Sequence, residues 1–123
     1  MWAVVDHDPT VEVSVITGAG RAFSAGGDLA MIERMTEEYD ATIEQWRDAG
    51  AIVERLLAAT KPIVSAVNGV AVGAGLAVAL LADVSIVAAS ARLSDGHARL
   101  GVAAGDHAAM LWPLLCSMAK AKY

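Results

Sequence analysis

Two glycine-bearing turns constrain the fold of this chain more than any other feature of its sequence. They cover residues 22–29 (AFSAGGDL) and 68–75 (NGVAVGAG), and each lies between a strand-like apolar run and a helix-like segment. A strand that turns tightly into a helix leaves the first N–H groups of that helix without intrahelical acceptors. Such groups, with the helix dipole behind them, can bind an anionic atom. The two turns together could therefore hold one oxygen.

Strand-like and helix-like segments alternate along the chain. Val11, Val13 and Val15 alternate with polar residues, which is typical of a strand, and Asp28 is placed to cap a short helix. The expected strands cover residues 11–17, 63–67 and 84–89, and the expected helices cover residues 29–35, 41–59 and about 107–118. This alternation predicts an α/β architecture.

Length and composition favour one domain with a core of small side chains. The chain has 123 residues, of which 56% are hydrophobic but only 5% aromatic. We therefore expect a core of closely packed small side chains rather than one built around a few large aromatic side chains. No linker divides it, a core-type strand is already expected at residue 11, and the last helix has no clear cap. We therefore expect residues 1–123 to form a single, partial domain.

Charge and patterning exclude several classes of partner. The net charge is −5 and no basic stripe is present, which argues against nucleic acid. The single cysteine, Cys116, and an N-terminus without a leader pattern favour the cytoplasm. Residues 62–82 carry no charge and are long enough to cross a bilayer. The Asn68–Gly69 turn inside them instead predicts a buried strand, a turn and a buried helix, and no membrane span.

Both glycine turns belong to longer motifs that resemble a known superfamily. Residues 16–29 (ITGAGRAFSAGGDL) resemble the first signature of the crotonase, or enoyl-CoA hydratase/isomerase, superfamily. Residues 61–75 (KPIVSAVNGVAVGAG) resemble its second signature at the expected distance, and residues 82–84 (ADV) resemble the continuation. The resemblance covers the chain from Val11 onward. It implies a crotonase-like β-β-α spiral (ClpP/crotonase type), incomplete at both ends, that binds an acyl-CoA thioester.

The resemblance also implies where the substrate binds. The backbone N–H groups of Gly27 and Ala74 would form an oxyanion hole, in which enolate charge develops on the thioester oxygen. The residues implied to contact the CoA or acyl moiety are Ser24, Ala25, Gly26, Asp28, Leu29, Ala30 and Gly73. CoA enters as part of the substrate, and we expect no separate cofactor and no metal. Superfamily members are commonly trimers or hexamers, so a homo-oligomer is expected if the full domain is present.

The proton-transfer positions depart from the superfamily pattern. Members that add water to an enoyl double bond usually carry two glutamates, and the matching positions here hold Ala77 and His97. An alanine methyl cannot move a proton, whereas imidazole can donate or accept one near neutral pH. Asp95, Asp106 and His107 lie nearby, although Asp95 also fits a turn before Gly96 and Asp106 a helix cap. We expect Asp106 and His97 to form the catalytic pair.

Other interpretations remain open at this point. The glycines could serve only tight turns and close packing, although packing alone does not explain two full motifs in order. A dinucleotide site is disfavoured because Gly18-x-Gly20 and Gly73-x-Gly75 each lack the third glycine. The chain could also be a non-catalytic fatty acyl-CoA-binding protein, or an inactive fragment.

Overall fold

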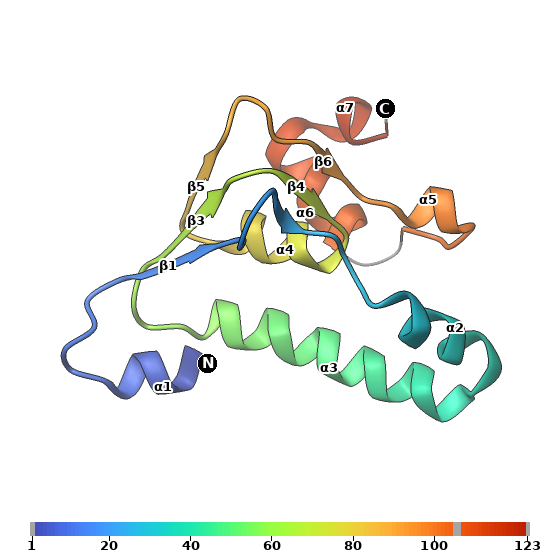
Figure 1. Ribbon diagram of the computed structural model, residues 1–123, viewed down its shortest axis with the longest axis horizontal. Helices are drawn as coiled ribbons and strands as arrows, with labels where there is room; N and C mark the ends of the chain where they lie inside the picture. Colours follow the sequence, from blue (N-terminus) through green and yellow to red (C-terminus); the bar gives the residue numbers. More distant parts are fainter. Residues whose placement is uncertain (1, 105–106, 123) are drawn as a thin grey trace.

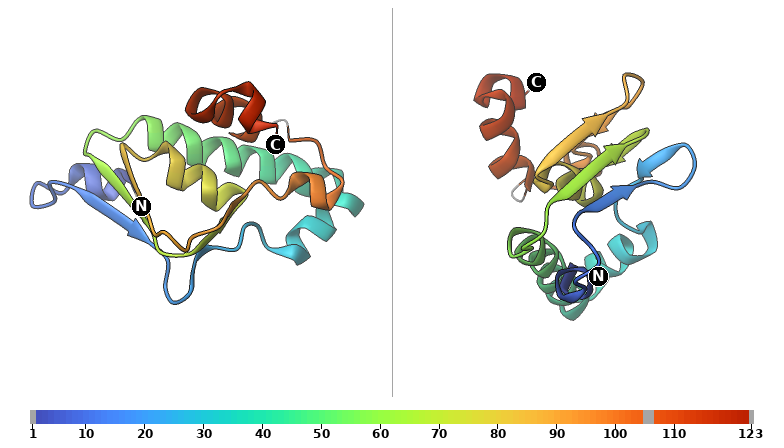
Figure 2. Two further views of the ribbon diagram at one scale, coloured as in Figure 1. Left: turned by 90° about the horizontal axis from the view of Figure 1, so that it is seen from above. Right: turned by 90° about the vertical axis from the view of Figure 1, so that its left-hand side faces the viewer.

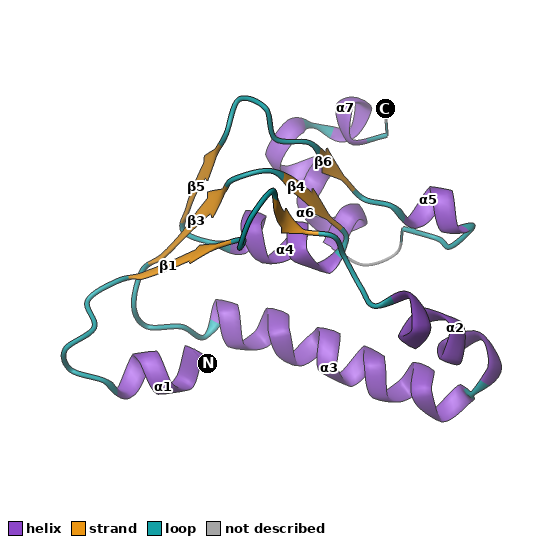
Figure 3. Cartoon of the chain, viewed as in Figure 1, coloured by secondary structure: helices purple, strands orange, loops and turns teal. Residues whose placement is uncertain are grey.

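The computed structural model describes residues 2–104 and 107–122 and contains two parallel sheets flanked by helices (Figure 1). The strands are β1 (Ser14–Thr17), β2 (Ala22–Ser24), β3 (Ile63–Val67), β4 (Val70–Val72), β5 (Val84–Val87) and β6 (Leu93–Ser94). The helices are α1 (Trp2–His7), α2 (Leu29–Glu37), α3 (Tyr39–Leu57), α4 (Ala74–Leu81), α5 (His97–Leu100), α6 (His107–Cys116) and α7 (Met118–Ala121). Figure 3 shows how strands and helices alternate along the chain.

Successive strands belong to different sheets. One sheet has the order β1-β3-β5 and the other the order β2-β4-β6, and all pairings are parallel. The two sheets meet at an angle, with α4 lying between them (Figure 2). A chain that places one strand in each sheet and then adds a helix winds as a spiral. The α/β architecture and the spiral of strands and helices are thus confirmed.

Small side chains fill the space between the sheets and α4. The buried cluster contains Val67 of β3, Ala71 of β4, and Leu76 and Ala79 of α4. Ser65, also fully buried, donates its hydroxyl to the carbonyl of Ala79 at 2.7 Å. A buried hydroxyl without a partner would be costly, so this bond fixes the end of α4 against the first sheet.

The side chain of Asn68 joins the two sheets. Its Nδ2 donates to the carbonyls of Gly18 (3.1 Å) and Gly20 (2.9 Å), and its Oδ1 accepts from the N–H of Gly18 (3.1 Å). Asn68 lies between β3 and β4, while Gly18 and Gly20 lie between β1 and β2. The two strand-to-strand connections are therefore held together, which brings β2 beside β4.

Glycine is required where these connections cross. A Cβ built on Gly69 would lie 2.1 Å from the carbonyl oxygen of Arg21, and one on Gly18 would lie 1.9 Å from the carbonyl oxygen of Ala22. Both obstacles are backbone atoms, which cannot rotate away. The glycines in these connections thus allow a close approach of two backbones.

The first strand is shorter than its sequence pattern predicts. The alternating valines predict a strand from residue 11, but β1 begins at Ser14 and Val13 is 48% exposed. Ser14 pairs with Ile63, the first residue of β3, and its N–H donates to the carbonyl of Pro62. Since Pro62 has no N–H to give, the ladder cannot extend further back.

A helix that no local pattern predicts precedes β1. The ammonium of Lys61 donates to the carbonyls of Val5 and Asp8, and Asp6 accepts from the N–H and hydroxyl of Thr60. These bonds connect α1 to the loop between α3 and β3, more than fifty residues away. Helix α1 has only six residues, too few to be stable through helix propensity alone. Its stability therefore depends on these tertiary contacts.

The other predicted elements are confirmed with small changes in their ends. The apolar run of residues 62–82 forms β3, β4 and α4 rather than one helix, and none of the helices in the described ranges is long and apolar enough to traverse a bilayer. The predicted last helix divides at Ser117, where φ is 72°, into α6 and α7.

Replacement of Gly69 by alanine should destabilise the fold strongly. Because the new methyl group would meet the Arg21 carbonyl at 2.1 Å, we expect Gly69→Ala to lower the free energy of unfolding by about 2 kcal/mol or more. Gly50→Ala is the matched control, since nothing lies within 4 Å of its Cβ position in α3. That variant should gain roughly 0.5–1 kcal/mol from helix propensity. Urea denaturation measures both, and equal stability of the two variants would contradict the close approach.

Candidate functional site

Three turns converge where β2, β4 and β6 end. These strands are parallel, so their carboxyl ends lie at one edge of the sheet, where open α/β sheets bind ligands. A Cβ on Gly73, just after β4, would lie 3.8 Å from the Asp95 carbonyl oxygen and 4.0 Å from the Gly26 Cα. Gly26 follows β2 and Asp95 follows β6. We call this convergence of residues 24–28, 73–75 and 95–97 the site edge.

The first turn of the site edge leads into α2. Gly26 has a φ of 99°, which favours glycine, and its N–H donates to the Ser24 hydroxyl at 3.3 Å. Asp28 caps α2 as expected, because its Oδ1 accepts from the N–H groups of Ala30 (2.8 Å) and Met31 (3.4 Å). The turn therefore ends in an ordered helix start, immediately after Gly27.

The second turn leads into α4 and packs against the first. Gly73 is the N-cap of α4 with a φ of 55° and a ψ of −129°, and its N–H donates to the Ser94 carbonyl at 3.2 Å. Gly75 faces Ser24, since a Cβ there would lie 2.1 Å from the Ser24 hydroxyl oxygen. Ala74, the first residue of α4, lies between these two glycines. Its position is set by the bond of Gly73 to Ser94 and by the contact of Gly75 with Ser24.

Two backbone N–H groups at the site edge have no internal acceptor. Within residues 2–104 and 107–122, no acceptor is found for the N–H of Gly27 or for that of Ala74. Both residues are exposed. The four first N–H groups of a helix lack intrahelical partners, and Ala74 is in this position. The edge therefore carries two exposed backbone N–H groups for which the described residues supply no acceptor.

The third turn carries an imidazole held by a carboxylate. His97 Nδ1 lies 2.5 Å from Asp95 Oδ1, and the His97 N–H donates to Asp95 Oδ2 at 3.2 Å. Both side chains are 19% exposed. Gly96 between them has a φ of 86°, a conformation that brings the two residues to the same side. An ionised carboxylate at this distance can accept a hydrogen bond from a protonated Nδ1.

The structure thus pairs His97 with Asp95, a residue for which the sequence also suggested an ordinary turn role. Asp106 lies outside the described residues, so its pairing with His97 stays a prediction. Ala77 is only 5% exposed and lies in α4, between the core residues. Its methyl group packs there and offers no proton-transfer chemistry.

The remaining residues implied to contact substrate follow the first turn. Ala25, Leu29 and Ala30 are exposed, and Leu29 at 68% is one of the larger apolar side chains on the surface. Ala25 and Gly26 lie in the turn before α2, and Leu29 and Ala30 are the first two residues of that helix. Their contact with a ligand stays a prediction.

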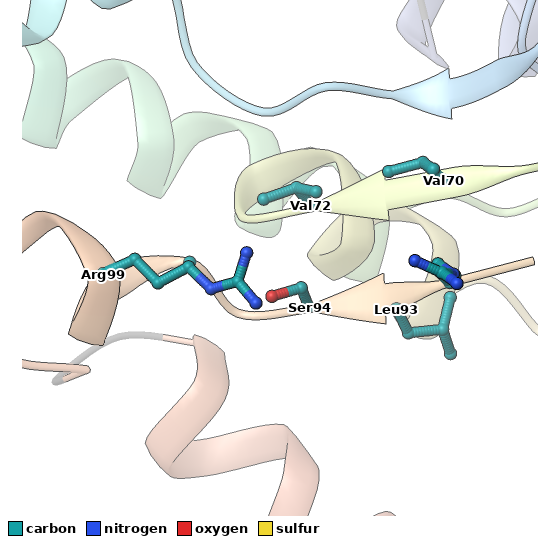
Figure 4. Close-up of a pocket in the computed structure, with 7 residues that line it drawn as sticks. Val70, Val72, Leu93, Ser94 and Arg99 are labelled. Atoms are coloured by element: carbon teal, nitrogen blue, oxygen red, sulfur yellow. The ribbon is translucent and has the colours of Figure 1, made fainter.

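A groove lies beside the site edge on the second sheet (Figure 4). Its volume is about 460 Å³, and its lining residues are Val70, Val72, Arg92, Leu93, Ser94, Gly96 and Arg99. Sequence reasoning missed it because strands as short as β4 and β6 give little periodicity. The one available signal was the pair of arginines on either side of β6 in an acidic chain.

No metal centre emerges from the part of the chain that the structure describes. There, His, Cys, Asp and Glu side chains do not gather in groups of three or more that could hold an ion.

Comparison with known proteins gives consistent similarities over the whole chain. The sequence model of the enoyl-CoA hydratase/isomerase family matches residues 2–123. The 1,2-epoxyphenylacetyl-CoA isomerase of Escherichia coli is 35% identical over 119 residues, covering 95% of this chain and 45% of that protein. The crotonyl-CoA hydratase of Syntrophomonas wolfei is 32% identical over 123 residues, covering 96% of this chain and 45% of that protein.

Solved structures agree. An enoyl-CoA hydratase/isomerase from Mycobacterium paratuberculosis superposes with a TM-score of 0.90 at 40% identity, covering 99% of this chain and 49% of that one. The chain therefore spans about half the length of the relatives that it matches.

The Asp95 carboxylate should determine which ring nitrogen of neutral His97 carries the proton. In the parent protein we expect the proton on Nδ1. In Asp95→Asn the amide can donate to Nδ1, so the proton should move to Nε2. The ¹⁵N chemical shifts of the imidazole measure this, with His97→Gln assigning the signals. Asp48→Asn, an exposed change of the same kind on α3, should leave them unchanged. An unaltered tautomer in Asp95→Asn would contradict the pairing.

Proposed function

Because the chain belongs to the enoyl-CoA hydratase/isomerase family, we propose that its site edge binds an acyl-CoA thioester and stabilises the enolate formed from it. The observation that carries this proposal is that the turns bearing Gly27 and Ala74, whose N–H groups have no acceptor among the described residues, meet the turn bearing the His97–Asp95 pair. Carbonyl oxygens that gain negative charge are stabilised by such preorganised donors. The loop over residues 24–30 would lie along the CoA moiety.

The two donors would act on charge that develops during the reaction. When water adds to the β-carbon of a 2-enoyl-CoA, or when a proton leaves the carbon next to the thioester carbonyl, an electron pair moves onto the carbonyl oxygen. The N–H groups of Gly27 and Ala74 would then donate to that oxyanion. Neither donor has to reorganise, because α2 is capped by Asp28 and Gly73 is bonded to Ser94. A fixed donor stabilises the enolate more than the neutral thioester.

His97 would be the group that moves the proton. Its Nδ1 is engaged by Asp95, which orients the ring. An imidazole can act as base or acid near neutral pH. With Ala77 in the other family position, one imidazole would serve where hydratases usually have two glutamates. Asp106 would be a second partner of His97.

A second candidate function is binding of a fatty acyl-CoA without turnover. The buried alanine at position 77 favours it, because half of the usual proton-transfer machinery is replaced by a methyl group. Both functions need the same two N–H donors, and only the first needs His97. A panel of saturated and 2-enoyl-CoA thioesters, tested for binding and for turnover, separates them.

Removal of one N–H donor should reduce turnover. Ala74 is the first residue of α4, a position that tolerates proline, so Ala74→Pro removes the donor without removing an intrahelical bond. We expect turnover of 2-enoyl-CoA substrates to fall by about 10²–10³. Ala74→Ser keeps the N–H and is the control for side-chain bulk. Equal turnover by the proline variant and the parent would refute the oxyanion hole.

Substitution of His97 should affect turnover and not binding. His97→Gln keeps a polar side chain of similar size but cannot exchange a proton, so we expect kcat to fall by about 10²–10⁴. The dissociation constant of a saturated acyl-CoA should stay within about twofold of the parent value, since the N–H donors remain. His7→Gln, in the exposed part of α1, is the control. Full activity of His97→Gln would show that another residue moves the proton.

A further inference from the structure

The groove beside the site edge carries charge of only one sign. Arg92 and Arg99 are the charged residues that line it, and no carboxylate is among its described lining residues. Neither guanidinium forms an ion pair within the described ranges. The whole chain has a net charge of −5, so the charge of this groove is opposite in sign to that of the chain as a whole. Such a surface favours an anionic ligand group.

The floor of the groove is apolar and ends at the site edge. Ala71 is fully buried, facing the core, so Val70 and Val72 point from β4 to the opposite face of the sheet. The Val72 side chain lies 3.6 Å from a Cβ built on Gly26 and 3.2 Å from one built on Gly96. A ligand bound at the site edge could therefore continue directly over Val72.

Arg99 lies close to the reacting end of this floor. It is in α5, two residues after His97, and its N–H donates to the Gly96 carbonyl at 3.1 Å. Figure 4 shows its side chain reaching from α5 toward Ser94 at the end of β6, with Val72 opposite. One helical turn separates Arg99 from Gly96, a span that a short acyl chain covers. The phosphates of CoA are separated from the thioester by the whole pantetheine arm.

We propose that this groove is an acyl-group subsite in which Arg99, assisted by Arg92, binds a carboxylate at the far end of the acyl chain. The methylene groups of the chain would contact Val70 and Val72. A guanidinium matches the planar geometry of a carboxylate and can donate two parallel hydrogen bonds. The groove volume of about 460 Å³ lies within the usual range of small-molecule sites. The inference rests on the proposed function, since it needs an acyl-CoA at the site edge.

The test compares two acyl-CoA thioesters of equal chain length, with and without the carboxylate. Adipyl-CoA and hexanoyl-CoA both have six-carbon acyl groups. By isothermal titration calorimetry, the 123-residue chain should bind adipyl-CoA at least about tenfold more tightly than hexanoyl-CoA. Arg99→Gln should abolish this preference and leave the affinity for hexanoyl-CoA unchanged. Arg92→Gln should reduce the preference in part.

Arg47→Gln is the matched control, because Arg47 is an exposed arginine on α3, outside the groove. Equal weakening of both thioesters by Arg99→Gln would show that the guanidinium contacts the CoA phosphates and would overturn the carboxylate subsite. Unchanged affinities in both groove variants would overturn it as well. Failure of the parent to bind either thioester would instead refute the proposed function itself. Thermal melting checks that each variant is folded.

Discussion

The contact between the two strand-to-strand connections is the constraint on which the rest of the structure depends. Asn68 bonds to the backbone of Gly18 and Gly20, and Gly69 allows the Arg21 carbonyl to approach. The connections lead directly into β2 and β4, so their contact sets the position of these strands in the second sheet. The site edge is the far end of the same strands. The hydrogen bonds of the Asn68 side chain thus help to bring the N-termini of α2 and α4 to the same edge of the sheet.

The two halves of the proposed chemistry depend on different parts of the chain. Oxyanion stabilisation would use backbone N–H groups, whose position depends on turn geometry and not on side-chain identity. Alanine at position 74 is therefore compatible with oxyanion stabilisation, because only its backbone N–H would be used. Gly27 is exposed, so a ligand could reach its N–H as well. Proton transfer needs a titratable side chain at a fixed place, which the alanine at position 77 cannot supply. The proposed N–H donors therefore tolerate changes of side chain that the proposed proton transfer does not.

Local sequence signals predicted the elements that local interactions stabilise. The Asp28 cap and the buried strand of residues 63–67 are confirmed, because a cap and an apolar run each act within a few residues. Strands β2, β4 and β6 have two or three residues each, too few for a period. Helix α1 depends on bonds from Thr60 and Lys61, which no local pattern contains. The resemblance indicated candidate site residues, whose roles stay predictions, but it did not indicate the His97–Asp95 pair or the groove.

In the proposed function, recognition of the acyl group and stabilisation of the enolate would depend on different turns of the site edge. The N–H groups belong to the first and second turns, whereas the imidazole and the nearest groove guanidinium belong to the third. Different interactions fix the three turns: the Asp28 cap fixes the first, the Gly73 bond to Ser94 fixes the second, and the left-handed glycines Gly96 and Gly101 lie at the two ends of α5 in the third. Because α5 is a single helical turn between two glycines, substitutions in it can alter which acyl group is accepted without moving Gly27 or Ala74. An architecture of this kind allows substrate selection to change while the enolate is stabilised in the same way.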